Sequence, residues 1–176
     1  MTLTAAGKTG INLGKGMRVG MSKSLKRVKT ALAEAGCAVD VLEMSESTRT
    51  AAEAAAAAGC EIDQIAKSII FQGKASSDVI LFITAGGNTV DPALAAECAG
   101  EELGRADAGV VRQVTGFAIG GVAPVGHLTA PRIFYDPRLS GFDTVYAAAG
   151  TPRHIFPIAP DDLLRITGAE VAEFTE

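Results

Sequence analysis

The protein has 176 residues, of which 48% are hydrophobic and 20% charged, with a formal net charge of −4. This length predicts one domain of ordinary size, and the composition excludes an intrinsically disordered chain. The negative charge argues against a surface that coats nucleic acid generally. Seven of the 16 basic residues lie within the first 29 positions, so a basic end precedes an acidic body. A basic end can contact phosphates, but on charge alone a solvated tail and helix face is the simpler interpretation.

Residues 1–20 are rich in glycine and lack hydrophobic periodicity, which predicts a flexible basic leader before one domain over 21–176. The three cysteines are widely spaced and no CxxC motif occurs, so neither a disulfide framework nor a zinc site is indicated. The longest strongly apolar run, 79–83, is too short to cross a bilayer. We therefore expect a cytoplasmic protein with no metal and no membrane contact.

The first half of the chain predicts two helices and a hairpin. Apolar residues at helical spacing predict a helix over 23–35, which Gly36 can end, followed by a short strand over 39–42. A capping-box pattern at Thr50 and Glu53 predicts a second helix over 51–58. Two continuous apolar runs, 69–71 and 79–83, are separated by a turn-like segment and predict neighbouring strands.

The second half predicts a mixture of strands and short helices. After a tight turn at 86–88, Asp91 and Pro92 predict the start of a helix that runs to about Ala99. The pattern over 100–115 is compatible with helix or strand. Further strands are expected at 132–135, 144–148 and 155–158, a helix at 161–166, and a last strand that contains Val171 and Phe174. This order predicts a single α/β or α+β domain whose sheet is mixed rather than purely parallel.

Lys67 is the first candidate for chemistry. It and Lys74 are the only lysines after residue 29, and Lys67 lies near the start of the apolar run 65–71. Burying an ammonium group is costly unless it is paired or faces a cavity. The residue is therefore either a cation aimed at a phosphate or an oxyanion, or a strand-end lysine that reaches water.

The glycine-rich segment 115–127 is the second candidate. Glycines allow positive φ and close approach of a ligand, and Pro124 stiffens the loop. Such a loop can present backbone N–H groups to an anion, or it can be a purely structural turn. It does not match the dinucleotide-binding fingerprint.

Two further residues remain open from pattern alone. Asp136 either orients a polar substrate group or starts a turn with Pro137, and His154 either exchanges protons or is a structural polar group. No Ser-His-Asp or Cys-His arrangement, GxSxG motif or pair of catalytic carboxylates is indicated.

Taken in order, several segments resemble the YbaK/ProX family of aminoacyl-tRNA deacylases, which is similar to the editing insertion domain of bacterial prolyl-tRNA synthetases. The resemblance covers about residues 21–175 and lies in these stretches: 50–59 (TAAEAAAAAG), 65–71 (IAKSIIF), 79–84 (VILFIT), 115–127 (TGFAIGGVAPVGH), 133–136 (IFYD), 145–150 (VYAAAG) and 163–171 (LLRITGAEV). The combination of the lysine with GGVxPxG is more specific than either part alone.

The resemblance implies a mixed, curved, barrel-like sheet flanked by helices, and hydrolysis of the ester between a mischarged amino acid and the 3′-terminal adenosine of tRNA. It implies no metal or organic cofactor. Lys67 matches the family's hallmark lysine, and the backbone around Gly120, Gly121 and Val122 matches the loop beside the reacting ester. The substrate-binding residues that we expect around them are Phe117, Pro124, Gly126, Asp136, Ala148 and His154. We also expect the basic helix face with Lys23, Lys26 and Arg27 to touch the acceptor stem.

The sequence departs from members that remove cysteine from tRNA. Ala148 stands where those proteins have serine, and the later aspartate position falls near Ile155. A small substrate such as alanine or serine is therefore as well supported as cysteine. The leading hypothesis is a freestanding trans-editing hydrolase that acts on the acceptor end of aminoacyl-tRNA, with an aminoacyl-tRNA synthetase as a further candidate partner. The alternatives are a non-catalytic tRNA- or synthetase-binding module of the same fold, and a hydrolase of free small-molecule esters. The sequence leaves the oligomeric state open.

Overall fold

A computed structural model describes residues 21–46 and 48–176; the predicted leader over 1–20 lies outside the described residues. The five α-helices of this part are α1 (Lys23–Glu34), α2 (Ala51–Ala58), α3 (Pro92–Ala99), α4 (Ala108–Thr115) and α5 (Pro160–Thr167). The strands are β1 (Leu42–Glu43), β2 (Ile65–Gly73), β3 (Val79–Ala85), β4 (Leu103–Arg105), β5 (Arg132–Tyr135), β6 (Val145–Ala148), β7 (His154–Ile158) and β8 (Glu170–Val171). Two short 3-10 helices cover Ile62–Gln64 and Pro137–Gly141.

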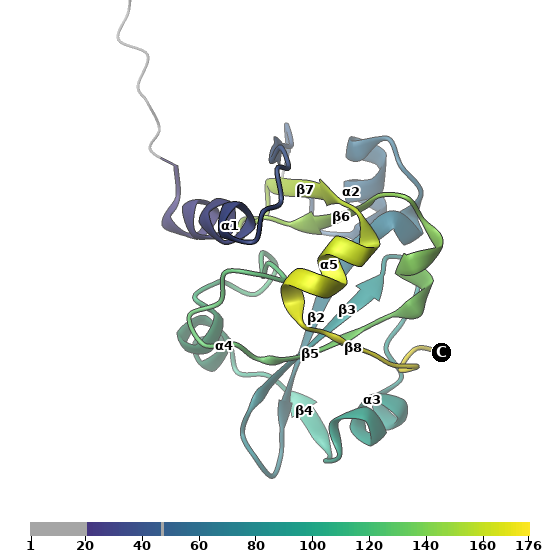
Figure 1. The fold of residues 1–176 in the computed structure, drawn as a ribbon. Helices are drawn as coiled ribbons and strands as arrows, with labels where there is room; N and C mark the ends of the chain where they lie inside the picture. The colour runs from purple at the N-terminus through teal and green to yellow at the C-terminus, as the bar shows by residue number, and fades with distance from the viewer. Residues whose placement is uncertain (1–20, 47) are drawn as a thin grey trace, which may run out of the picture.

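The strands form one mixed sheet in the order β1-β7-β6-β2-β3-β5-β8, with β4 paired to β2 beside that path (Figure 1). β2 and β3 form the predicted antiparallel hairpin, whereas β2 with β6, β3 with β5 and β5 with β8 are parallel pairs. The prediction of one domain with a mixed α/β architecture is confirmed.

The two faces of the sheet carry different cores because side chains alternate along each strand. Leu81 and Ile83 of β3 pack with residues of α1, α4, α5 and the glycine-rich loop. Ile80 and Phe82 face the other side and pack with α3 and Phe174. The alanine-rich α2 lies against Ile65 at the start of β2.

Most helices begin at the capping residues that the sequence predicts. Thr50 and Glu53 form the reciprocal capping box of α2, and Asp91 caps α3, where Pro92 occupies the first turn. The ambiguous stretch over 100–115 contains β4 and α4; the Asp107 side chain caps α4 and Gly116 ends it with φ of 78°.

Two predicted strands differ in extent from those observed. The first strand covers only Leu42 and Glu43, where it pairs with β7. The last strand ends at Val171, and the predicted member Phe174 is instead fully buried among Phe82 and its neighbours. The sequence pattern assigns Phe174 to a strand because the residue is apolar. In the structure this apolar side chain fills the core and belongs to no strand.

Candidate active site

A gap in the pairing of β2 contributes to a pocket. On the edge away from β3, β2 pairs with β6 at Ile65 and Ala66 and with β4 from Phe71 to Gly73. Residues 67–70 between these pairs have no strand partner on that edge among the described residues. A pocket of about 460 Å³ is lined by these four residues and by side chains of α2, β4, β6, β7 and the glycine-rich loop.

The gap leaves polar groups of β2 without strand partners. The amide of Gly73 donates to the carbonyl oxygen of Asp78 at 2.9 Å, which fixes the register of hydrogen-bonded pairs between β2 and β3. Because these pairs alternate along antiparallel strands, the backbone groups of Ser68 and Ile70 are directed toward the gap. The Ser68 hydroxyl oxygen, in addition, is the one buried side-chain polar atom of the described residues without a hydrogen-bond partner.

The glycine-rich loop brings two free amides to the same pocket. Gly120 and Val122 both line it, and neither of their N–H groups forms a hydrogen bond within the part of the chain that is described. The intervening Gly121 is absent from the lining, and its amide donates to the carbonyl oxygen of Ala118 at 3.1 Å. Gly120 has φ of 94°, a conformation that favours glycine.

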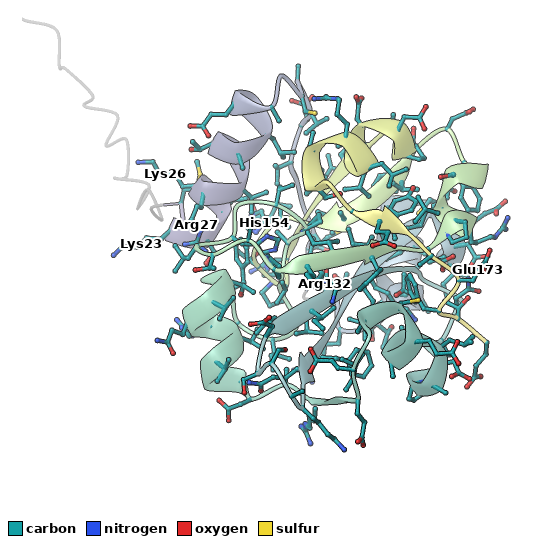
Figure 2. The ribbon with its side chains drawn as sticks, turned by 60° about the horizontal axis from the view of Figure 1, so that its bottom comes forward. Lys23, Lys26, Arg27, Arg132, His154 and Glu173 are labelled. Atoms are coloured by element: carbon teal, nitrogen blue, oxygen red, sulfur yellow. The ribbon has the colours of Figure 1, made fainter. Side chains whose placement is uncertain are left out.

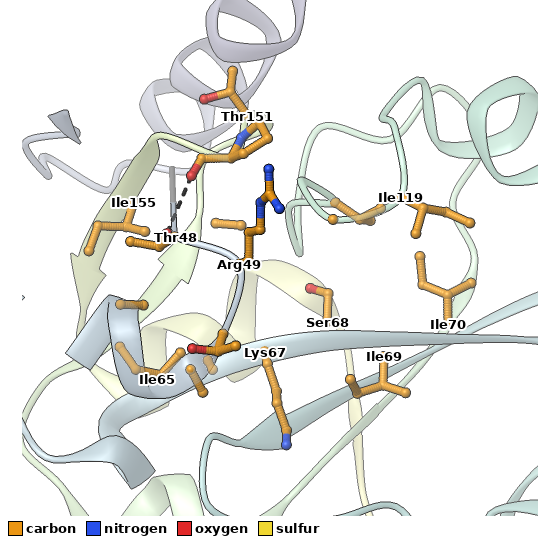
Figure 3. Close-up of a pocket in the computed structure, with 18 of the residues that line it drawn as sticks. Thr48, Arg49, Ile65, Lys67, Ser68, Ile69, Ile70, Ile119, Thr151 and Ile155 are labelled. Carbon is orange, nitrogen blue, oxygen red and sulfur yellow. Dashed lines mark hydrogen bonds between the residues drawn. The ribbon is translucent and has the colours of Figure 1, made fainter. Parts of the chain in front are cut away.

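Lys67 lines the pocket, but its ammonium group lies on the opposite side of β2 from Ser68 (Figure 3). There Nζ donates to the carbonyl oxygens of Asn88 at 2.5 Å and Gly86 at 3.2 Å. Burial lowers the pKa of Lys67, and the nearby charges of Asp136 and Asp63 partly oppose this shift. A direct contact between Lys67 and a substrate therefore remains a prediction, which requires the flexible side chain to rotate.

Asp136 lies outside the pocket lining and is only 2% exposed. Its Oδ2 atom accepts hydrogen bonds from the Ala85 amide at 3.1 Å and from Asn88 Nδ2 at 2.9 Å, and its Oδ1 atom accepts from the Arg138 amide at 2.9 Å. Asp136 therefore holds the turn whose carbonyl oxygens bind Lys67.

Ala148 and His154 lie where the sequence places them, in the pocket lining. His154 Nδ1 forms a hydrogen bond of 2.5 Å with the hydroxyl oxygen of Thr151, which also lines the pocket. The small Ala148 side chain leaves room in the pocket beside β6.

The structure does not bring Phe117, Pro124 and Gly126 into this lining. Phe117 is fully buried, with the Arg27 guanidinium carbon 4.6 Å from its ring centroid, while Pro124 and Gly126 border a separate hollow near α1. Arg27 also donates to the carbonyl oxygens of Gly126 and Gly116, each at 2.8 Å. These residues shape the loop that carries Gly120 and Val122.

The basic face of α1 is divided by this contact. Lys23 and Lys26 are exposed and extend away from α1, whereas Arg27 is bound to the loop (Figure 2). Of the three residues expected at the acceptor stem, only the two lysines present their charge to solvent.

Several polar residues of the lining were not predicted from the sequence, among them Arg49, Ser68 and Arg105. Ser68 could have been predicted, because it follows Lys67 in the same strand and consecutive strand residues point to opposite faces. Arg49 and Arg105 reach the pocket only through the packing of α2 and β4 around β2, which no local pattern reveals.

The described ranges, 21–46 and 48–176, hold no group of three or more His, Cys, Asp or Glu side chains that could bind a metal ion. No helix in the same ranges has both the length and the apolar character needed to cross a membrane.

A family profile described as the aminoacyl-tRNA editing domain matches residues 45–166. The chain belongs to this family. The match covers α2, the whole β2 edge, the glycine-rich loop and β7, and therefore every element that lines the pocket. The resemblance noted from the sequence is confirmed.

Similar proteins and solved structures cover between 84% and 89% of this chain. The uncharacterized protein YwhH of Bacillus subtilis (strain 168) is 31% identical over 148 residues, which are 84% of this chain and 94% of that protein. A crystal structure of a proposed trans-editing enzyme for prolyl tRNA synthetase is 44% identical to this chain. The two match with a TM-score of 0.83, and the match covers 89% of this chain and 99% of that one. The crystal structure of the hypothetical protein APE2540 is 30% identical, with a TM-score of 0.78 over 85% and 99% of the two chains.

Proposed function

We propose that this protein is a freestanding trans-editing hydrolase, which cleaves the ester between a small non-cognate amino acid and the 3′-terminal adenosine of tRNA. Membership of the editing-domain family supports an aminoacyl-tRNA substrate. The similar crystal structure named as a proposed trans-editing enzyme is covered over 99% of its length, which supports action by a separate chain.

The observation that carries the proposal is the set of unpartnered polar groups around one pocket. The free amides of Gly120 and Val122 are suited to stabilise the negative charge that develops on the ester carbonyl oxygen. The Ser68 hydroxyl and the open edge of β2 can bind the amino or ribose hydroxyl groups of the substrate. Water is the attacking group in this scheme, and the protein positions and polarises the ester.

The lining also supports a small aminoacyl group. A volume of about 460 Å³ lies in the range of small-molecule pockets, and it must hold part of the terminal nucleoside as well as the amino acid. Ala148 borders this space, so a larger side chain there would exclude all but the smallest substrates.

The test is a deacylation assay with several amino acids on several tRNAs, with wild-type protein and matched variants. We expect Lys67→Met to slow hydrolysis strongly, whereas Lys74→Met serves as the control. Lys74 is the other lysine of the body and forms an exposed ion pair with Glu102. Intact mischarged tRNA across the whole panel would refute the hydrolase, and a Lys67→Met variant as fast as wild type would refute the assignment of the lysine.

One observation favours a second candidate, a binding module of the same fold without catalysis. The Lys67 ammonium group donates its hydrogen bonds to the carbonyl oxygens of Gly86 and Asn88, and it lies on the side of β2 opposite Ser68. Such a module would bind tRNA or a synthetase in the same assay mixture and leave every ester intact.

A further inference from the structure

The charge of the pocket lining is opposite to that of the molecule. The protein has 20 acidic and 16 basic residues, yet none of the described residues that line the pocket carries a carboxylate. The lining contains three of the basic residues, Arg49, Lys67 and Arg105. A pocket that gathers cations without acids in an acidic protein favours an anionic ligand group.

Arg49 is the member of this set whose charge is best placed for such a ligand. In Figure 3 its guanidinium group extends from the segment before α2 across the pocket toward Thr151, between the 150s loop and Ile119. The residue is exposed, so its charge lies at the mouth of the pocket. Within the described residues the guanidinium forms neither a hydrogen bond nor an ion pair.

The backbone that carries Arg49 is fixed on both sides. The Arg49 amide donates to Glu53 Oε2 at 2.8 Å, within the cap of α2. The preceding Thr48 donates from its amide and from its hydroxyl to the carbonyl oxygen of Pro152, at 3.1 Å and 3.3 Å. The Glu53 carboxylate, which also interacts electrostatically with Arg49, is thus bound to backbone amides, and the Arg49 guanidinium lies over the pocket with no hydrogen-bond partner among the described residues.

We propose that Arg49 binds the phosphodiester group that precedes the terminal adenosine of the tRNA. The inference rests on the proposed function, because it places the ester beside Ser68 and Gly120 and the 5′ phosphate of the same nucleotide at the mouth. Guanidinium groups bind phosphate through two parallel charge-assisted hydrogen bonds. Arg49 is in this arrangement a substrate-anchoring residue, distinct from the groups that polarise the ester.

The experiment measures equilibrium binding of adenosine 5′-monophosphate, adenosine and the trinucleotide CCA to the full chain. The variants are Arg49→Gln, Arg49→Lys and, as the charge-matched control, Arg112→Gln. Arg112 is exposed on α4, outside the pocket lining, and has no side-chain hydrogen bond to the described residues. Because Arg49 has no such bond either, both variants are expected to keep the wild-type melting temperature.

Wild-type protein should bind adenosine 5′-monophosphate and CCA more tightly than adenosine. We expect Arg49→Gln to weaken binding of the two phosphate-containing probes by about tenfold, the scale of one hydrogen-bonded charge, and to leave adenosine binding unchanged. The slope of log affinity for CCA against log salt should fall by about 0.7, the value for one single-strand phosphate contact. Arg49→Lys should retain that slope, and Arg112→Gln should match wild type.

The proposal is overturned if wild type does not prefer the phosphate-containing probes, or if Arg49→Gln binds them as wild type does. It is also overturned if Arg49→Gln weakens adenosine equally, because the residue would then shape the pocket rather than bind phosphate. None of these outcomes depends on hydrolysis. A protein that shows the expected binding and leaves every mischarged tRNA intact would retain the Arg49 site and lose the proposed catalytic activity.

Discussion

Lys67 and Ser68 are consecutive residues of β2, yet their polar atoms lie in opposite surroundings. On the Lys67 side the ammonium group binds two carbonyl oxygens of a turn that Asp136 holds in place. On the Ser68 side a hydroxyl group and two loop amides lack partners within the described part of the chain. The first side is a satisfied network and the second is an unsatisfied one.

The difference distinguishes polar groups that maintain the local structure from polar groups that are available to bind a ligand. Buried polar groups that are fully hydrogen-bonded fix a local structure, and those left without partners cost stability unless a ligand or water binds them. We therefore expect substitutions of the groups that hold the turn beside Lys67 to affect folding most, and substitutions on the Ser68 side to affect substrate most. Variants in the turn network, in the glycine-rich loop and at Ser68 test this division.

The largest effect should come from Asp136→Ala. The change leaves the donors Ala85 N and Asn88 Nδ2 unpaired in a buried site, so the free energy of unfolding should fall by about 3 kcal/mol. Urea denaturation measures the change, and Asp143→Ala, at an exposed position, is the control. Equal stability of the two variants would show that the turn is held by other contacts.

Arg27→Gln should lower the free energy of unfolding by about 2 kcal/mol, because it removes two hydrogen bonds from a charged donor to the glycine-rich loop. The same variant should lower kcat more than it raises KM, since the loop carries the free amides of Gly120 and Val122. The neighbouring Lys26→Gln, which changes an exposed charge on the same helix, should alter neither quantity by as much. An unchanged kcat would separate the loop from catalysis.

Ser68→Ala should act in opposite directions on stability and activity. Removing an unpartnered buried hydroxyl should leave the free energy of unfolding unchanged or raise it by about 1 kcal/mol. Hydrolysis of mischarged tRNA should fall about tenfold, on the scale of one hydrogen bond to substrate. A destabilised variant with full activity would reverse the comparison between the two sides of β2.

The smallest effect concerns pH and His127. Its Nε2 atom donates to the Ala123 carbonyl oxygen at 2.7 Å, and burial lowers the pKa of the imidazole. A lowered pKa means that the unfolded chain binds the proton more tightly than the folded chain does. The contribution of neutral His127 to folding stability is therefore fully present above the unfolded pKa of about 6.5, and it is lost as the pH falls toward the folded pKa. The melting temperature should drop more between pH 7.5 and 5.5 in wild type than in His127→Gln. Identical drops would assign the acid sensitivity to other groups.

The fold was predictable where its signals are local. The caps at Thr50 and Asp91 and the hairpin of β2 and β3 depend on neighbouring residues, and all three are present. β4 escaped prediction because only three residues form it and its pairing with β2 joins distant parts of the chain. Phe174 was misassigned for a related reason, since its burial among aromatic rings of β3 and β5 is a long-range property.

The candidate site was predictable only in its unusual residues. The scarcity of lysine drew attention to Lys67, and the glycine content drew attention to Gly120 and its neighbours. The role of Asp136 in holding the Lys67 turn, and the presence of Arg49 at the pocket mouth, follow from contacts between segments far apart in sequence. The unpaired stretch of β2 itself has no sequence signature, because it arises from where β6 ends and β4 begins.

That unpaired stretch also bears on aggregation. An open strand edge is a template on which another chain can add a strand, and proteins usually protect such edges with charge, bulges or short length. On this edge of β2, residues 67–70 alone are open within the described part of the chain, and β6 and β4 occupy the edge on either side. The opening is too short to take a strand of typical length, which is about five or six residues. This edge of β2 can therefore keep unpaired backbone groups for a small ligand without offering another chain an edge to extend.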